Sequence, residues 1–158
     1  MDEPAVRLLA TLERALPALR ALGDADAARR PAPGKWSPKE LVGHLVDSAS
    51  VNAERFVRAR FADDLVLPGY DQDAWVAAQG YADAPWDELV TLFDALNRHV
   101  ARIMAATPEG DRARERRAHN LDAIAFRTVP TSEPTTLSYL MADYVDHLEH
   151  HLRGLVPG

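Results

Sequence analysis

The segment from residue 137 to residue 155 constrains the fold of this chain more than any other stretch. Apolar side chains recur along it at the spacing of an α-helix, so one face of a single long helix is expected to be buried. His147 and His151 lie on the same stripe, four residues apart. On a helix this spacing gives a rise of about 6 Å and a rotation of about 40°, so both imidazole rings project in the same direction. The apolar members of the stripe are Leu137, Leu140, Met141, Tyr144, Leu148, Leu152 and Leu155.

Two interpretations of this histidine pair are open. Two buried imidazoles can simply form hydrogen bonds, which is the commoner arrangement for an isolated pair. Alternatively, both rings bind one metal ion. Their ring nitrogens must then approach to roughly 3.3 Å, because metal–nitrogen bonds are about 2.0–2.1 Å long. Rotation of the side chains can bring the nitrogens that close, so the pair alone is compatible with both interpretations. A third histidine elsewhere in the chain favours the metal.

The third histidine lies on a helix that is predicted to begin at Pro38. Ser37, Pro38 and Glu40 supply an N-cap serine, a proline in the first turn and a glutamate three residues after the cap, which together form a capping box. The helix is expected to end between residues 61 and 64. His44 lies on its inner stripe, and Asp47, about one turn further on, is a candidate to accept a hydrogen bond from that ring. The other members of the stripe are Leu41, Leu45, Ser48, Asn52, Phe56 and Ala59.

Two further long helices are predicted, from residue 4 to 22, where Pro17 is expected to bend the helix, and from residue 86 to 106. The sequence shows no repeat and no clear strand pattern, and residues 65–85 and 112–136 are predicted to be long connections. A chain of 158 residues is long enough for one domain with a core and too short for two ordinary ones. We therefore predict an all-α fold, a four-helix bundle with long connections, as a single domain over residues 1–158.

Histidines in the core of such a bundle need a partner for each ring nitrogen, because an unpaired buried polar group costs about 1–3 kcal/mol. Three of them on the inner stripes of two helices are unfavourable unless one ligand joins them, and a divalent metal ion can do so. We predict that His44, His147 and His151 bind zinc or nickel, although imidazole also suits iron and copper. The histidines expected to lie outside the site are His99, His119 and His150.

The connection over residues 65–85 carries large aromatic side chains that either fold over a site as a lid or seal the end of the bundle. These aromatic residues are Tyr70, Trp75 and Tyr81. Carboxylates on the same segment either line the site or are solvated. The candidates for an additional acid or base beside the metal are Asp47, Asn52, Asp71 and Asp73.

Composition limits the partners of this chain. The net charge of −6 argues against a broad nucleic-acid surface, and the arginines between residues 112 and 117 are interspersed with acidic residues, which favours a solvated loop or helix end. No apolar run approaches the length of a membrane span, and the acidic start of the chain is unlike a signal peptide. Since the chain has no cysteine, it has no disulfide and no thiol nucleophile of its own. We expect a cytoplasmic protein that binds a small molecule and neither nucleic acid nor membrane.

Three segments resemble one known family. Residues 35–48 (KWSPKELVGHLVDS), 68–75 (PGYDQDAW) and 143–152 (DYVDHLEHHL) are similar to segments of the DinB-like (damage-inducible B-like) superfamily, the first of them to its second-helix signature. With the order and lengths of the helices, the resemblance covers essentially the whole chain. The crossover over residues 112–136 departs from it, because it is arginine-rich and lacks a short glycine-rich approach to the last helix.

The resemblance implies a four-helix bundle in which one histidine of the second helix and an H-x-x-x-H pair of the last helix bind a divalent metal. In this sequence those positions are His44, His147 and His151. The superfamily includes thiol-cofactor S-transferases and a mycothiol-dependent isomerase, and its members are often homodimers. We therefore expect a metal-dependent transferase with a small-molecule substrate and a low-molecular-weight thiol as cosubstrate, assembled as a homodimer.

Two alternatives to a transferase are open. The first is a non-catalytic stress or binding protein that a metal ion stabilises. The second is a metal-dependent hydrolase in which one of the carboxylates named above acts as general base. Three neutral protein ligands leave at least one coordination position open, as in catalytic rather than structural zinc sites. An acid or base beside that open position would distinguish an enzyme from a binding protein.

Overall fold

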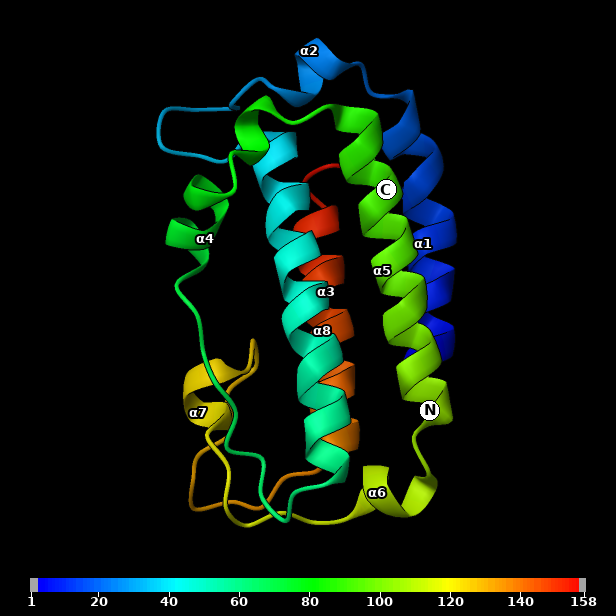
Figure 1. The fold of residues 1–158 in the computed structure, drawn as a ribbon, viewed down its shortest axis with the longest axis vertical. Helices are drawn as coiled ribbons and strands as arrows, with labels where there is room; N and C mark the ends of the chain where they lie inside the picture. The colour runs from blue at the N-terminus through cyan, green and yellow to red at the C-terminus, as the bar shows by residue number, and fades with distance from the viewer. Residues whose placement is uncertain (1–2, 157–158) are drawn as a thin grey trace.

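Four long helices form the body of the molecule in a computed structural model that describes residues 3–156 (Figure 1). They are α1 (Pro4–Ala21), α3 (Pro38–Arg60), α5 (Trp86–Ala106) and α8 (Leu137–Leu152). Residues 3–156 contain no β-strand, only isolated bridges between Leu65 and His119 and between Arg116 and Thr135. The predicted all-α four-helix bundle is therefore confirmed. Within the same residues, no helix combines the length and the apolar character that crossing a membrane requires.

The four helices pack in the ring order α1–α5–α3–α8, and α8 closes the ring against α1. Consecutive long helices are therefore not always neighbours, since α1 and α3 face each other across the ring. The colours in Figure 1 show that α3 and α5 run in one direction while α1 and α8 run in the other. Helix α3 is consequently antiparallel to α8, which places the N-terminal part of α3 beside the C-terminal part of α8.

Local signals in the sequence set the ends of the two helices that carry the stripe histidines. At the start of α3, the Ser37 side chain accepts a hydrogen bond from the Glu40 N–H at 3.3 Å, and the Glu40 carboxylate accepts one from the Ser37 N–H at 2.8 Å. This is the predicted capping box. The Thr136 hydroxyl caps α8 by accepting from the Tyr139 N–H at 3.0 Å. Helix α8 ends at Leu152, three residues before the predicted end of the stripe.

The connections contain more helix than predicted. Short helices α2 (Asp24–Ala27), α4 (Gln72–Ala78), α6 (Glu109–Ala113) and α7 (Leu121–Ile124) and a 3-10 turn, η1 (Tyr81–Asp83), lie in the loops. Helix α1 ends at Ala21 with Leu22 as its C-cap, and it continues through Pro17, which is exposed. Residues 65–85 run along α3, and residues 112–136 cross the base of the bundle to α8 (Figure 1).

Arg116 corrects the prediction of a solvated arginine cluster. Its side chain is only 1% exposed, and its guanidinium donates to the backbone carbonyl of Ala59 at 2.9 Å, in the last turn of α3. It also donates to the carbonyls of Asp111 at 3.3 Å and Arg114 at 3.2 Å. The carbonyls at a helix C-terminus have no partner within the helix and carry partial negative charge, so a cation there is favourable. Arg116 therefore attaches the crossover to the end of α3.

His119 is also structural. It is buried, its Nε2 lies 2.7 Å from the carbonyl oxygen of Glu133, and its Nδ1 accepts from the Leu121 N–H at 3.2 Å. Both ring nitrogens therefore have partners within the crossover. This position is consistent with the prediction that His119 is not one of the metal ligands.

Candidate metal centre

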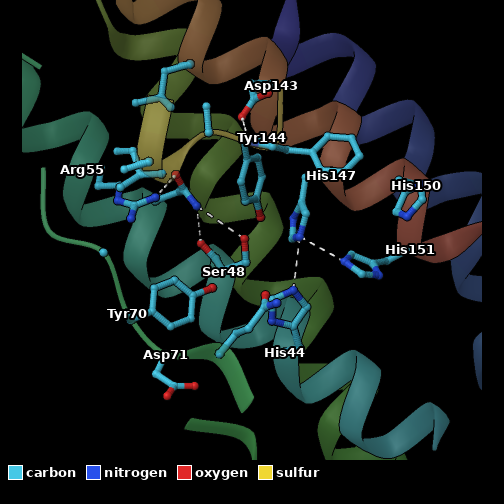
Figure 2. A pocket seen from close by; sticks show the side chains of 18 residues that line it. His44, Ser48, Arg55, Tyr70, Asp71, Asp143, Tyr144, His147, His150 and His151 are labelled. Carbon is cyan, nitrogen blue, oxygen red and sulfur yellow. Dashed lines mark hydrogen bonds between the residues drawn. The ribbon is translucent and has the colours of Figure 1, made fainter. Parts of the chain in front are cut away.

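Three histidine side chains meet between α3 and α8 (Figure 2). His44 lies in the second turn of α3, and His147 and His151 lie on consecutive turns near the end of α8. The antiparallel packing of the two helices brings these distant positions to the same level. We call His44, His147 and His151 the histidine triad.

The ring nitrogens of the triad are separated by the distances that a shared metal ion requires. Nε2 of His147 lies 3.2 Å from Nε2 of His44 and 3.1 Å from Nε2 of His151. Two nitrogens bound to one tetrahedral ion at about 2.0–2.1 Å are roughly 3.3 Å apart. One ligand atom from each histidine lies within 4.8 Å of the others, and no aspartate or glutamate of residues 3–156 joins the group. The donor set therefore fits a divalent ion held by three imidazoles.

Hydrogen bonding alone satisfies this arrangement poorly. A neutral imidazole nitrogen carries either one hydrogen or one lone pair, so it makes one good hydrogen bond in the plane of its ring. Nε2 of His147 faces the Nε2 atoms of two other rings at once. A cation accepts lone pairs from all three, which resolves the conflict.

Burial keeps the triad neutral and hence able to bind a cation. It lowers the pKa of His44 to about 4, with a further contribution from His151, and lowers the pKa of His147 to about 3. The pKa of His151 is also lowered, mainly by burial. Neutral imidazole is the form that binds metals, so all three ligands are available at neutral pH without deprotonation.

The prediction that Asp47 orients the His44 ring is wrong. Both oxygens of the buried Asp47 carboxylate accept from the Gln79 amide, at 2.8 and 2.9 Å, and one also accepts from the Tyr81 hydroxyl at 2.7 Å. Nδ1 of His44 is buried and has no hydrogen-bond partner among residues 3–156. Its ring instead lies 5.0 Å, centroid to centroid, from the ring of Trp36. Packing rather than a carboxylate therefore orients His44.

A pocket of about 600 Å³ adjoins the triad and runs along the groove between α3 and α8. One wall is a polar stripe of α3 at helical spacing, consisting of His44, Ser48, Asn52 and Arg55. The crossover contributes the apolar residues Ala123, Ile124, Ala125 and Phe126, and α8 contributes Leu140 together with the polar residues Asp143, Tyr144, His147, His150 and His151. The loop that carries Tyr70 and Asp71 also lines the pocket (Figure 2). The segment over residues 65–85 thus contributes to the pocket.

The other candidate residues are divided between this pocket and its surroundings. Asn52 is buried in the polar stripe, and Asp71 lines the pocket while its side chain caps α4 by accepting from the Ala74 N–H at 3.0 Å. Asp73 lies outside this pocket, in a neighbouring one that also reaches His151. His99 is exposed on α5 and does not line this pocket.

Several residues that line the pocket were not identified from the sequence as parts of the site. Those with functional side chains are Arg55, Phe126, Asp143 and His150. His150 is exposed and its ring centroid lies 5.1 Å from that of Phe126. Arg55 carries a signal that the spacing could have revealed, because it continues the polar stripe of α3 at eleven residues from His44. The position of Phe126 depends on the fold of the crossover, for which the sequence offers no periodic pattern.

Comparison with known proteins gives a family and a similar structure. The sequence model of the DinB superfamily matches residues 7–155. A solved structure of YfiT from Bacillus subtilis, described as a probable metal-dependent hydrolase with an unusual four-helix bundle topology, superimposes with a TM-score of 0.77. The match covers 98% of this chain and 82% of that one at 19% identity, which establishes a shared fold. No curated protein sequence matches the chain.

Proposed function

This chain belongs to the DinB superfamily, and on that basis, together with the geometry of its histidines, we propose that it is a metal-dependent enzyme. In this proposal the histidine triad holds a divalent ion, zinc or nickel, and the adjoining pocket binds a small-molecule substrate. The observation that supports it best is the convergence of three ring nitrogens, from two helices, at the end of that pocket. The resemblance to this family also predicts a homodimer, which light scattering of the purified protein tests.

We propose transfer of a low-molecular-weight thiol as the reaction. Three neutral imidazoles leave the full +2 charge of the ion uncompensated, so the open coordination position favours an anionic ligand. A bound zinc ion stabilises the deprotonated form of a thiol or of water. Because the chain contains no cysteine, the thiol comes from a cosubstrate. The protein contributes three imidazole ligands, a polar wall on α3 and apolar side chains of the crossover, which together orient the second substrate.

Hydrolysis is the second candidate, and two observations favour it. YfiT, which has the same fold, is described as a probable metal-dependent hydrolase. His150 lines the pocket and its ring centroid lies 5.2 Å from that of His151, so its imidazole is available to accept a proton from a water molecule near the triad. Asp71 and Asp143 also line the pocket, so a carboxylate base is the alternative to His150, although no carboxylate joins the triad in residues 3–156. A metal-stabilised binding protein without turnover is the third candidate.

Cobalt substitution tests the thiol proposal. Cobalt-loaded protein mixed with each of a panel of cellular thiols should acquire a sulfur-to-metal charge-transfer band in the near ultraviolet. The band should be absent in His147→Ala, which removes one ligand, and present in His99→Ala, which changes an exposed histidine on another helix. Transfer of the thiol to small electrophiles is then measured with the zinc or nickel form.

Each outcome selects one of the three candidates. A charge-transfer band together with transfer supports the thiol transferase. If no thiol gives a band but the metal-loaded protein cleaves esters or amides and His150→Ala abolishes the cleavage, the hydrolase is correct. If metal binding raises the melting temperature and neither reaction occurs, the protein is a binding protein.

A further inference from the structure

Arg55 lies at the opposite end of the polar stripe from His44 (Figure 2). The two residues are eleven positions apart on α3, which corresponds to three turns, a rise of roughly 16 Å and the same face of the helix. Ser48 and Asn52 lie between them on that face. Arg55 therefore shares the pocket with the triad but is far enough from it to contact a different part of a bound molecule.

The guanidinium of Arg55 is buried without a counter-charge. The residue is 6% exposed. Its partners among residues 3–156 are two neutral oxygens, the Pro68 carbonyl at 2.6 Å and the Asn52 side chain at 3.5 Å, the latter at the limit for a hydrogen bond. Nε is buried and has no partner among these residues. A buried charge is unfavourable unless it is paired and hydrogen-bonded. The guanidinium of Arg55 therefore needs an anionic partner, which the described residues do not supply.

Arg116 provides a comparison within the same molecule. It is also buried and its Nε also has no partner in residues 3–156, but its guanidinium donates to three backbone carbonyls, one of them in the last turn of α3. Arg116 lines no pocket with the triad and has a structural role in joining the crossover to the bundle. Arg55 makes fewer hydrogen bonds and faces a cavity.

We propose that Arg55 binds an oxyanion of the substrate, a carboxylate or a phosphate. Guanidinium groups bind such anions through two parallel hydrogen bonds, and they do so most strongly where water is excluded. The crossover contributes apolar side chains to the pocket, Ile124 and Phe126 among them, which can contact an apolar part of the substrate between its two ends. The substrate class is therefore an elongated anionic molecule whose oxyanion lies at Arg55. That its other end reacts at the triad rests on the proposed function, whereas anion binding by Arg55 does not.

Metal-free protein allows the oxyanion site to be tested separately from the metal. Protein treated with a chelator is titrated with hexanoate, with hexyl phosphate and with hexanol, which share an apolar chain and differ at one end. Binding is followed by calorimetry and by the Nε–H resonance of Arg55 in isotope-labelled protein. Wild-type protein should bind one of the two anions about 10- to 100-fold more tightly than the alcohol, because hydrogen bonds to charged groups are stronger than neutral ones.

Arg55→Gln should lose this preference while still binding the alcohol, and Arg55→Lys should keep part of it. Arg58→Gln is the matched control, because Arg58 is exposed on the same helix and pairs with Glu54 at 2.6 Å outside the pocket. A far-ultraviolet circular dichroism spectrum like that of the wild type shows that the bundle is folded in each variant. Which anion is preferred distinguishes a carboxylate from a phosphate substrate. Equal affinity of wild-type protein for the anions and the alcohol, or an unchanged preference in Arg55→Gln, would overturn the proposal even if the triad binds thiols as proposed.

Discussion

Gly43 offers the sharpest test of how the connection between α3 and α5 packs on the bundle. It lies inside α3, next to His44, and the ring of Tyr81 covers it. A Cβ atom added to Gly43 would lie 2.2 Å from Cδ2 and 2.3 Å from Cγ of Tyr81, distances at which the ring must move. Tyr81 is buried, and its hydroxyl donates to Asp47 at 2.7 Å. We therefore predict that Gly43→Ala displaces the Tyr81 ring and breaks that hydrogen bond.

Opposing contributions decide how much Gly43→Ala changes the free energy of unfolding. Alanine favours a helix over glycine by about 1 kcal/mol. Overpacking a buried site costs about 1–3 kcal/mol. Loss of a hydrogen bond to a charged group costs about 1.5–3 kcal/mol. The net result is a decrease of about 1.5–5 kcal/mol in the free energy of unfolding, although helix propensity alone predicts an increase.

Urea denaturation of the metal-free protein at neutral pH measures this change, since the linear extrapolation gives the free energy of unfolding directly. The control is a double-mutant cycle with Tyr81→Ala. Without the tyrosine ring, Gly43→Ala no longer meets an obstacle and should stabilise the protein by up to about 1 kcal/mol.

The predicted change of sign between the two backgrounds makes the reasoning refutable. If Gly43→Ala is as stable as the wild type, the close contact between α3 and Tyr81 is not a constraint. If the substitution is equally destabilising with and without Tyr81, its cost has another origin.

Three further predictions concern the triad and the crossover. Alanine at any position of the triad should abolish near-stoichiometric binding of zinc or nickel, measured by elemental analysis. The metal content should be unchanged in the alanine variants of His99, His119 and His150. Loss of metal in His150→Ala but not in His147→Ala would contradict the assignment of the ligands. Because burial lowers the pKa of His44 to about 4 and that of His147 to about 3, the unfolded chain binds more protons below its histidine pKa of about 6.5. The free energy of unfolding of metal-free protein should therefore fall as the pH decreases from about 6.5 to about 4, and His44→Gln should reduce that slope in urea denaturation. Arg116→Ala should lower the free energy of unfolding by about 2–4 kcal/mol, because three carbonyls lose a charged donor, while Arg117→Ala should change it by less than about 0.5 kcal/mol, since Arg117 is exposed.

Structural features that depend on residues close together along the chain could be predicted from the sequence. The start of α3 follows from the capping box at Ser37, and the inner faces of α3 and α8 follow from their apolar spacing. The spacing predicted three histidines on those inner faces, and the structure brings one nitrogen of each close together. Whether they bind a metal remains a prediction for the assays above.

Features that depend on contacts between distant segments could not be predicted. Spacing places Asp47 one turn from His44, but the carboxylate bonds to Gln79 and Tyr81, which arrive from a connection with no periodic pattern. The same limit applies to Arg116, whose partners include a carbonyl 57 residues away in the chain. The pairing of α1 with α5 rather than with α3 is likewise a property of the packed ring and not of any one helix.

The separation of the triad along the chain has a consequence for the order of events during biosynthesis. His44 and His147 are 103 residues apart, and the ring closes only when α8 packs against both α3 and α1. A nascent chain that has not reached residue 147 contains one of the three ligands, so it cannot hold the ion. An ion bound to all three histidines would close a loop of more than a hundred residues. The entropic cost of closing a loop grows only slowly with its length, so this separation along the chain adds little to the cost of binding. Under the proposed function, the ion would therefore bind only after α8 has been synthesised and has packed against α3.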